Sequence, residues 1–190
     1  MISLAKWQPL ITQLRQREDG VAYLEFALIL PVLMMLFLGG QELTRYVQAS
    51  QKVDKLTHTV VDLIAQAPTI STGDMNTIMQ AAPHIMAPFN FAQNGVIIVS
   101  CIGYDSQDNL VVKWQHRGGG TLARNSHIGT AGQNATLPAG FVVEDRDNVI
   151  VAETYYRFKP IINEEYVSPT DFYRTAYYLP RLGELATLTP

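Results

Sequence analysis

The sequence predicts an α+β protein, in which a long N-terminal transmembrane and stalk helix precedes a small antiparallel-sheet domain with a packed helix. Three observations carry this prediction. Nearly all of the strongly apolar sequence in the 190-residue chain falls in one block, residues 21–40. Residues 41–67 then carry apolar side chains at helical spacing, and from Gly95 onward apolar residues alternate as they do in strands.

The N-terminal part divides into a leader and a membrane segment. Residues 1–20 are mostly polar, carry Lys6, Arg15 and Arg17, and end in a glycine. The next twenty residues, VAYLEFALILPVLMMLFLGG, contain one charged residue. As a helix they would be about 30 Å long, which matches the hydrocarbon core of a bilayer. A secretory signal peptide has a shorter apolar core followed by an A-x-A-like site, so we expect residues 21–40 to span the membrane.

The predicted membrane helix continues as an amphipathic stalk at 41–67. No proline or glycine interrupts this stretch, and apolar residues recur three, four or seven positions apart, with polar residues between them. These apolar residues are Leu43, Tyr46, Val53, Leu56, Val60 and Leu63. The stripe can pack against the chain's own domain or against neighbouring subunits, and different segments can do each.

The remaining residues, 68–190, are expected to form an external α+β domain. A second helix is predicted at 71–82, where Ser71 precedes Asp74 as in a capping box and Pro83 and Pro88 end the helix. Strands are predicted at 96–102, 110–116, 141–144, 149–158 and 172–179.

Two polar stretches connect the predicted strands. DSQDN, residues 105–109, predicts a solvated hairpin turn rather than a calcium loop, because no glycine or distal glutamate completes an EF-hand pattern. Residues 118–140 are rich in Gly, Asn and Thr, and a loop of this length is usually functional or disordered. Its triple glycine lacks the GK[ST] of a phosphate-binding loop.

Composition and motifs argue against several classes of function. The formal net charge of −3 does not indicate a nucleic-acid partner. The single cysteine, Cys101, excludes an internal disulfide and is predicted to be a buried small apolar residue. Its alternative is a reactive thiol, which nothing basic in the neighbouring sequence would favour. The four histidines have no metal-binding spacing, and no nucleophile or nucleotide motif is present, so we expect no enzyme, metal or cofactor. Charged positions near the C-terminal strands are expected on an outer sheet face with surface ion pairs, namely Glu153, Arg157, Glu164 and Glu165.

The junction DGVAYLEF carries the strongest functional signal. Gly20 ends the leader, and Glu25 follows five residues later inside the apolar helix, where a charged side chain is costly and usually has a partner. Cleavage after Gly20 would give Val21 a new α-amino group about one helical turn from the Glu25 carboxylate. The alternative is a glutamate at the helix edge that reaches the lipid headgroups.

These residues resemble the N-terminus of the TadE/TadF-type pseudopilins of the Tad (tight adherence) pilus. The similarity lies in GVAYLEF, in Pro31 after ALIL, and in the long helix leaving the membrane. Phe26 after the glutamate is closer to the larger minor members than to the small major pilins, which carry Glu-Tyr. The segments VIVAETYYRFKPII and DFYRTAYYLPR also resemble, more loosely, the closing strand pair of that family.

The resemblance implies a processing and assembly function. It implies that a prepilin peptidase cuts between Gly20 and Val21, that 1–20 is a cleavable prepilin leader, and that Glu25 and Phe26 act in processing or assembly. Expected partners are the peptidase, other pilins, Tad assembly platform proteins and the lipid bilayer. The expected location is the bacterial inner membrane, single pass, with a periplasmic C-terminal domain. The implied function is that of a minor pilin or pseudopilin, and the alternative is a single-pass membrane protein with an external binding or sensor domain.

Overall fold

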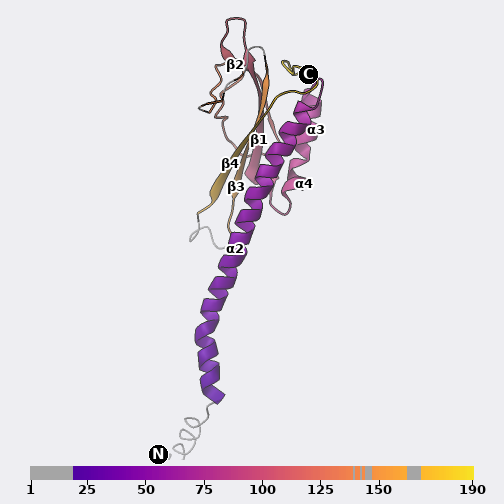
Figure 1. Ribbon diagram of the computed structural model, residues 1–190. Helices are drawn as coiled ribbons and strands as arrows, with labels where there is room; N and C mark the ends of the chain where they lie inside the picture. The colour runs from indigo at the N-terminus through magenta and orange to yellow at the C-terminus, as the bar shows by residue number, and fades with distance from the viewer. Residues whose placement is uncertain (1–18, 139, 142, 144–146, 162–167) are drawn as a thin grey trace, which may run out of the picture. The chain divides into compact units, whose positions relative to one another are not determined.

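The computed structural model describes residues 19–138, 140–141, 143, 147–161 and 168–190. It contains two compact units, one ending at Thr44 and one spanning Arg45–Pro190. Most of the expected leader, including Lys6, Arg15 and Arg17, lies outside the described residues. The long N-terminal helix and the antiparallel sheet confirm the predicted α+β class (Figure 1).

Helix α2, Asp19–Ala65, contains the predicted membrane segment and almost all of the predicted stalk. Pro31 lies inside the helix. It lacks the backbone N–H that would bond to the preceding turn, and membrane helices tolerate this loss. From Gln41 to Ala65 no glycine or proline breaks the hydrogen-bond ladder. The helix ends three residues before Pro68.

The second unit is built on a four-stranded antiparallel sheet in the order β2-β1-β3-β4. The strands are β1, Gly95–Tyr104; β2, Leu110–Gly118; β3, Val149–Phe158; and β4, Thr170–Tyr178. They confirm four of the five predicted strands. The central pair, β1 and β3, is buried along nearly its whole length, because both faces of the sheet are covered.

Helices cover one face of the sheet. The C-terminal part of α2 packs there with α3, Thr72–Gln80; α4, Ala82–Met86; and α5, Phe91–Asn94 (Figure 1). The largest apolar cluster joins helix residues such as Leu56 and Met75 to strand residues such as Val99. Val53 and Val60 of the predicted stripe are buried in the same cluster, so this part of the stripe packs against the chain's own domain.

A capping box and a proline explain where α3 and α4 begin. Ser71 caps α3 in a full capping box, with its hydroxyl accepting from the Asp74 N–H and the Asp74 carboxylate accepting from the Ser71 N–H. The helix ends at Gln80, earlier than predicted. Pro83 does not end it but lies in the first turn of α4, a position where its missing N–H costs nothing.

The Gly-rich stretch and residues near it cover the opposite face of the sheet. Ile128 and Val143 join a second apolar cluster with Val112, Val149 and Val151. The prediction of a strand at 141–144 is wrong for its described residues, Phe141 and Val143. Val143 instead serves as a single buried contact, and its carbonyl accepts a hydrogen bond from the Tyr104 hydroxyl.

The C-terminal segment, residues 179–190, lies against the turn between α2 and α3 and against β2. The Arg181 N–H donates to the carbonyl of Ala65 at 2.8 Å, which satisfies an orphan acceptor at the end of α2. Further along, Leu185 accepts from the Trp114 indole at 2.7 Å, and Thr189 pairs with residues 70–72. This segment is therefore bonded to the second unit, and its Leu185 is buried in the main apolar cluster.

Candidate functional site

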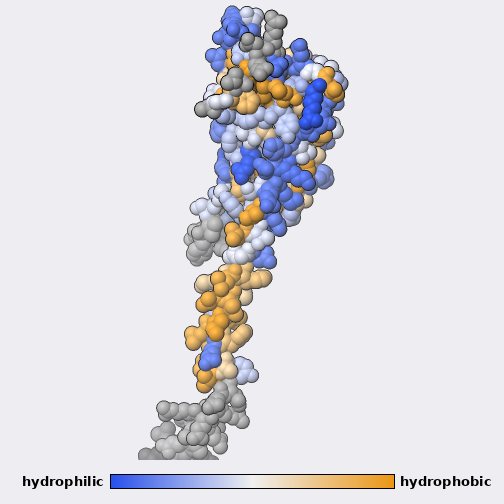
Figure 2. Space-filling model, viewed as in Figure 1, coloured by the Kyte–Doolittle hydropathy of each residue, from blue (hydrophilic) through white to orange (hydrophobic). Residues whose placement is uncertain are grey.

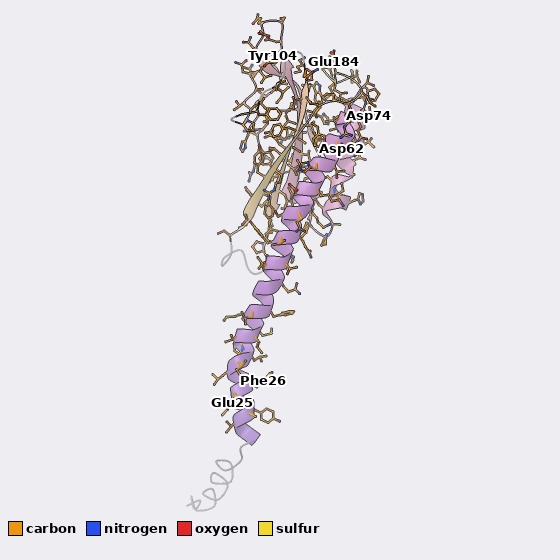
Figure 3. The ribbon with its side chains drawn as sticks, viewed as in Figure 1. Glu25, Phe26, Asp62, Asp74, Tyr104 and Glu184 are labelled. Atoms are coloured by element: carbon orange, nitrogen blue, oxygen red, sulfur yellow. The ribbon has the colours of Figure 1, made fainter. Side chains whose placement is uncertain are left out.

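The first two turns of α2 hold all four residues that the sequence singled out. Gly20, Val21, Glu25 and Phe26 are all exposed, and Figure 3 labels the last two on this part of the helix. Val21 and Glu25 are four residues apart, so they lie on the same helix face within side-chain reach. This arrangement places a carboxylate next to the residue that would become the first of a cleaved chain.

Gly20 has no packing partner that explains why it is glycine. A Cβ atom built there meets no heavy atom within 4 Å outside its own local backbone, and the residue is helical. Glycine in a helix costs about 1 kcal/mol relative to alanine. Packing among the described residues therefore does not explain why this residue is glycine. A requirement for glycine here would be imposed by another molecule.

The surface of α2 around Glu25 is apolar on every side. Large apolar side chains are exposed at most positions between Val21 and Leu38, and Figure 2 shows this part of the helix as a nearly continuous hydrophobic surface. The helix is long and apolar enough to cross a membrane. Glu25 is the one charged residue between Val21 and Gly40, and no described residue forms a hydrogen bond or ion pair with its carboxylate.

The described part of the domain offers no metal centre of the usual kind, since it contains no group of three or more His, Cys, Asp or Glu side chains suited to a metal ion. His116 binds Asn76 at 3.0 Å, and burial lowers its pKa.

Asp105 accepts from the backbone N–H groups of Asn109 and Gln107, at 2.9 and 2.8 Å, and these bonds lower its pKa. The predicted hairpin turn at 105–109 is thus confirmed.

The prediction for Glu153 is wrong. The sequence placed it on an outer sheet face, whereas its side chain is fully buried beneath the Gly-rich stretch. One carboxylate oxygen accepts from the His127 N–H at 2.8 Å, from the Tyr173 hydroxyl at 2.9 Å and from the Tyr155 hydroxyl at 3.1 Å. The other oxygen accepts from the Ser126 hydroxyl.

The electrostatics of this cluster keep the two phenols protonated. Burial, and then the negative charge of Glu153, raise the pKa of Tyr155 and Tyr173 above the usual phenol value. Both hydroxyls therefore remain donors throughout the physiological pH range. The run VIVAETYYRF has apolar residues on both faces, which indicates a strand covered on both sides, but it does not reveal the loop donors that make a buried carboxylate tolerable.

The surface ion pairs expected beside Glu153 do form at Arg157. Its guanidinium binds Asp171 at 2.9 Å, and Arg124 of the Gly-rich stretch binds the same carboxylate. Glu164 and Glu165 lie outside the described residues. Arg174 binds Ser50 at 2.9 Å and Arg181 binds Asp62 at 3.0 Å, so both arginines tie the C-terminal part of the chain to α2.

Comparison with protein families gives a match in the N-terminal part of the chain. Residues 20–62 match the family model described as TadE-like protein. A search of curated proteins and a search of solved structures found no match. The matched residues begin at Gly20 and include Glu25, Phe26 and most of α2. The looser resemblance at 148–182 stays a prediction.

Proposed function

We propose that this chain, with its TadE-like segment at residues 20–62, is a minor pilin or pseudopilin that supports assembly of a Tad-type adhesive pilus. It works by packing with other subunits rather than by catalysis. The observation that carries this proposal is the exposed Glu25 carboxylate, one helical turn from the Gly20–Val21 bond in the apolar, membrane-length segment of α2.

The proposed sequence of events follows from the chemistry of α2. The apolar segment holds the chain in the inner membrane, and a prepilin peptidase cleaves after Gly20. The new amine at Val21 then neutralises Glu25, within one subunit or between neighbours, which lowers the cost of a carboxylate in lipid. Phe26 adds apolar contact area beside this pair. The expected partners are the peptidase, other pilins and the platform proteins of the Tad system.

Processing can be tested at Gly20. Coexpression of the full chain with a matching prepilin peptidase should give a product whose intact mass corresponds to a start at Val21. Gly20→Leu should block cleavage, because the peptidase must approach the backbone closely. Gly39→Leu is a matched control, because a Cβ at Gly39 also meets nothing within 4 Å. Cleavage of Gly20→Leu at the wild-type rate, or a start at Met1 in the wild type, would contradict the proposal.

Assembly can be tested at Glu25. Glu25→Ala and Glu25→Gln should insert into the membrane at least as well as the wild type, since a carboxylate in lipid costs a few kcal/mol. Both should lose surface piliation and adherence, measured by immunogold labelling and a surface-attachment assay. Glu42→Gln, which removes a carboxylate of the same helix outside the apolar segment, should retain processing. If both Glu25 variants assemble normally, a membrane-anchored binding or sensor domain becomes the better explanation.

A further inference from the structure

Glu153 is a buried acid that the proposed assembly function does not use. It lies on β3, on the sheet face opposite the helices, and its side chain has no exposed surface. Within the described residues no ion pair reaches its carboxylate. A buried carboxylate without a cation is costly, so hydrogen-bond donors must compensate it.

The loop over this face supplies two of those donors. Ser126 and His127 each donate to Glu153, one through a hydroxyl and one through the backbone N–H. The other two donors, Tyr155 and Tyr173, belong to the sheet. Tyr155 also contacts the carbonyl of Asn125 at 2.9 Å. Two consecutive loop residues, Ser126 and His127, are therefore held on this carboxylate through charge-assisted bonds, which are stronger than neutral ones, and Asn125 is held by a neutral bond from the Tyr155 hydroxyl.

Elsewhere the covering loop, residues 119–138, is held mainly by neutral or solvent-exposed contacts. Residues 132–135 pair with the outer edge of β2, where Val112 donates to Gln133 at 2.9 Å and Ala135 donates to Leu110 at 2.8 Å. Ile128 is its buried apolar contact, and Arg117 binds loop carbonyls at the exposed surface. The loop has no regular helix or strand of its own.

We infer that Glu153 is a latch whose carboxylate holds the covering loop on the sheet, and that this loop opens as one unit while the helix-covered side of the domain stays folded. The inference does not depend on the proposed pilus function, because it rests on the second unit alone.

Hydrogen exchange measured by mass spectrometry on the full chain in detergent micelles tests this latch. Glu153→Gln replaces one accepting oxygen by a donor and removes the charge. Peptides from 121–137 should then exchange about tenfold faster or more, because charge-assisted bonds become neutral ones. Peptides from 72–86 on the helix side should keep their wild-type rates. Ser126→Ala, a milder change outside the sheet, should give a smaller increase in the same loop peptides.

Asp171→Asn is the matched control. It also removes a carboxylate that binds the loop, through Arg124, but this carboxylate is solvent-exposed. It should change loop exchange far less than Glu153→Gln. The latch is refuted if Glu153→Gln and Ser126→Ala both exchange like the wild type. It is also refuted if Glu153→Gln accelerates the helix-side peptides equally, or if Asp171→Asn opens the loop as much. If Glu153→Gln does not fold, the comparison of Ser126→Ala with Asp171→Asn decides between the latch and a surface ion pair.

Discussion

Cys101 lies in the middle of β1 on the face of the sheet that the helices cover, and its side chain is fully buried. Burial raises the pKa of its thiol to about 12, although the charge of Lys113 partly opposes the shift. A thiol with this pKa is almost entirely protonated at neutral pH, so it has little nucleophilic character. Cys101 therefore acts as a packing residue.

Native Cys101 should resist alkylation. Iodoacetamide at pH 8 should leave the folded chain unmodified over hours, whereas the chain in guanidinium chloride should be labelled within minutes. Intact mass measures both. Rapid labelling of the folded chain, at a rate close to that of the denatured chain, would show that the thiol is accessible.

Cys101 and Glu153 show how far single residues can be predicted from this sequence. Cys101 alternates with Ile97 and Val99, so its burial followed from strand periodicity. Glu153 was misplaced because its charge suggested an exposed position. Its burial depends on donors from Ser126 and His127, which are 27 and 26 residues away in the sequence. Local pattern cannot reveal a partner at that separation.

At the scale of elements, the C-terminal segment is fitted closely to the turn after α2. A Cβ added to Gly183 would lie 2.3 Å from the carbonyl oxygen of Pro68, and this oxygen belongs to the backbone, which cannot move aside easily. Gly183 is thus required by the close approach of two chain segments. The same segment provides the carbonyl of Leu185 to the Trp114 indole.

Gly183→Ala should destabilise the domain by about 1–3 kcal/mol, as overpacking does in a close-fitted site. The midpoint of thermal unfolding, followed by circular dichroism in micelles, measures this. Gly73→Ala is the control, because a Cβ there meets only the Ser71 hydroxyl oxygen, at an ordinary 3.6 Å, and lies within α3. An unchanged midpoint for Gly183→Ala would mean that the segment does not pack as described.

Elements with strong local signals were predicted, and those fixed by tertiary contacts were not. The capping box at Ser71 predicted the start of α3 but not its end, and the strand-like apolar runs predicted the four strands. The short helices α4 and α5 have too few residues to show a period. The apolar residues Phe141 and Val143 resembled a strand, but Val143 is a packing contact of the cover over the sheet.

At the scale of the whole molecule, the arrangement of the candidate site could be predicted because it depends on local sequence. Gly20, Val21, Glu25 and Phe26 lie within two turns of one helix, so their spacing alone defines their arrangement. Orientation across the membrane is different. Three basic residues precede the apolar segment, and Arg45, Lys52 and Lys55 follow it, so the positive-inside rule favours neither direction strongly.

The proposed function sets the orientation, with the N-terminus in the cytoplasm and the domain outside. Alkaline phosphatase fused after Pro190 should therefore be active, and a fluorescent protein that folds only in the cytoplasm should stay dark at the same position. Enzyme activity and fluorescence per molecule of fusion measure this. The reverse pattern would overturn the orientation and the pilin function with it.

The hydrogen bond from Arg181 to Ala65 also bears on when the domain can fold during synthesis. The ribosome finishes the apolar helix early, yet the residue that closes the end of that helix is made more than a hundred residues later, and the Thr189–Ile70 contact spans 119 positions. Contacts this distant in sequence form slowly, because a long loop must first close. A chain truncated before residue 181 lacks this closure. Residue 189 therefore has to be synthesised before the domain can close all of these contacts.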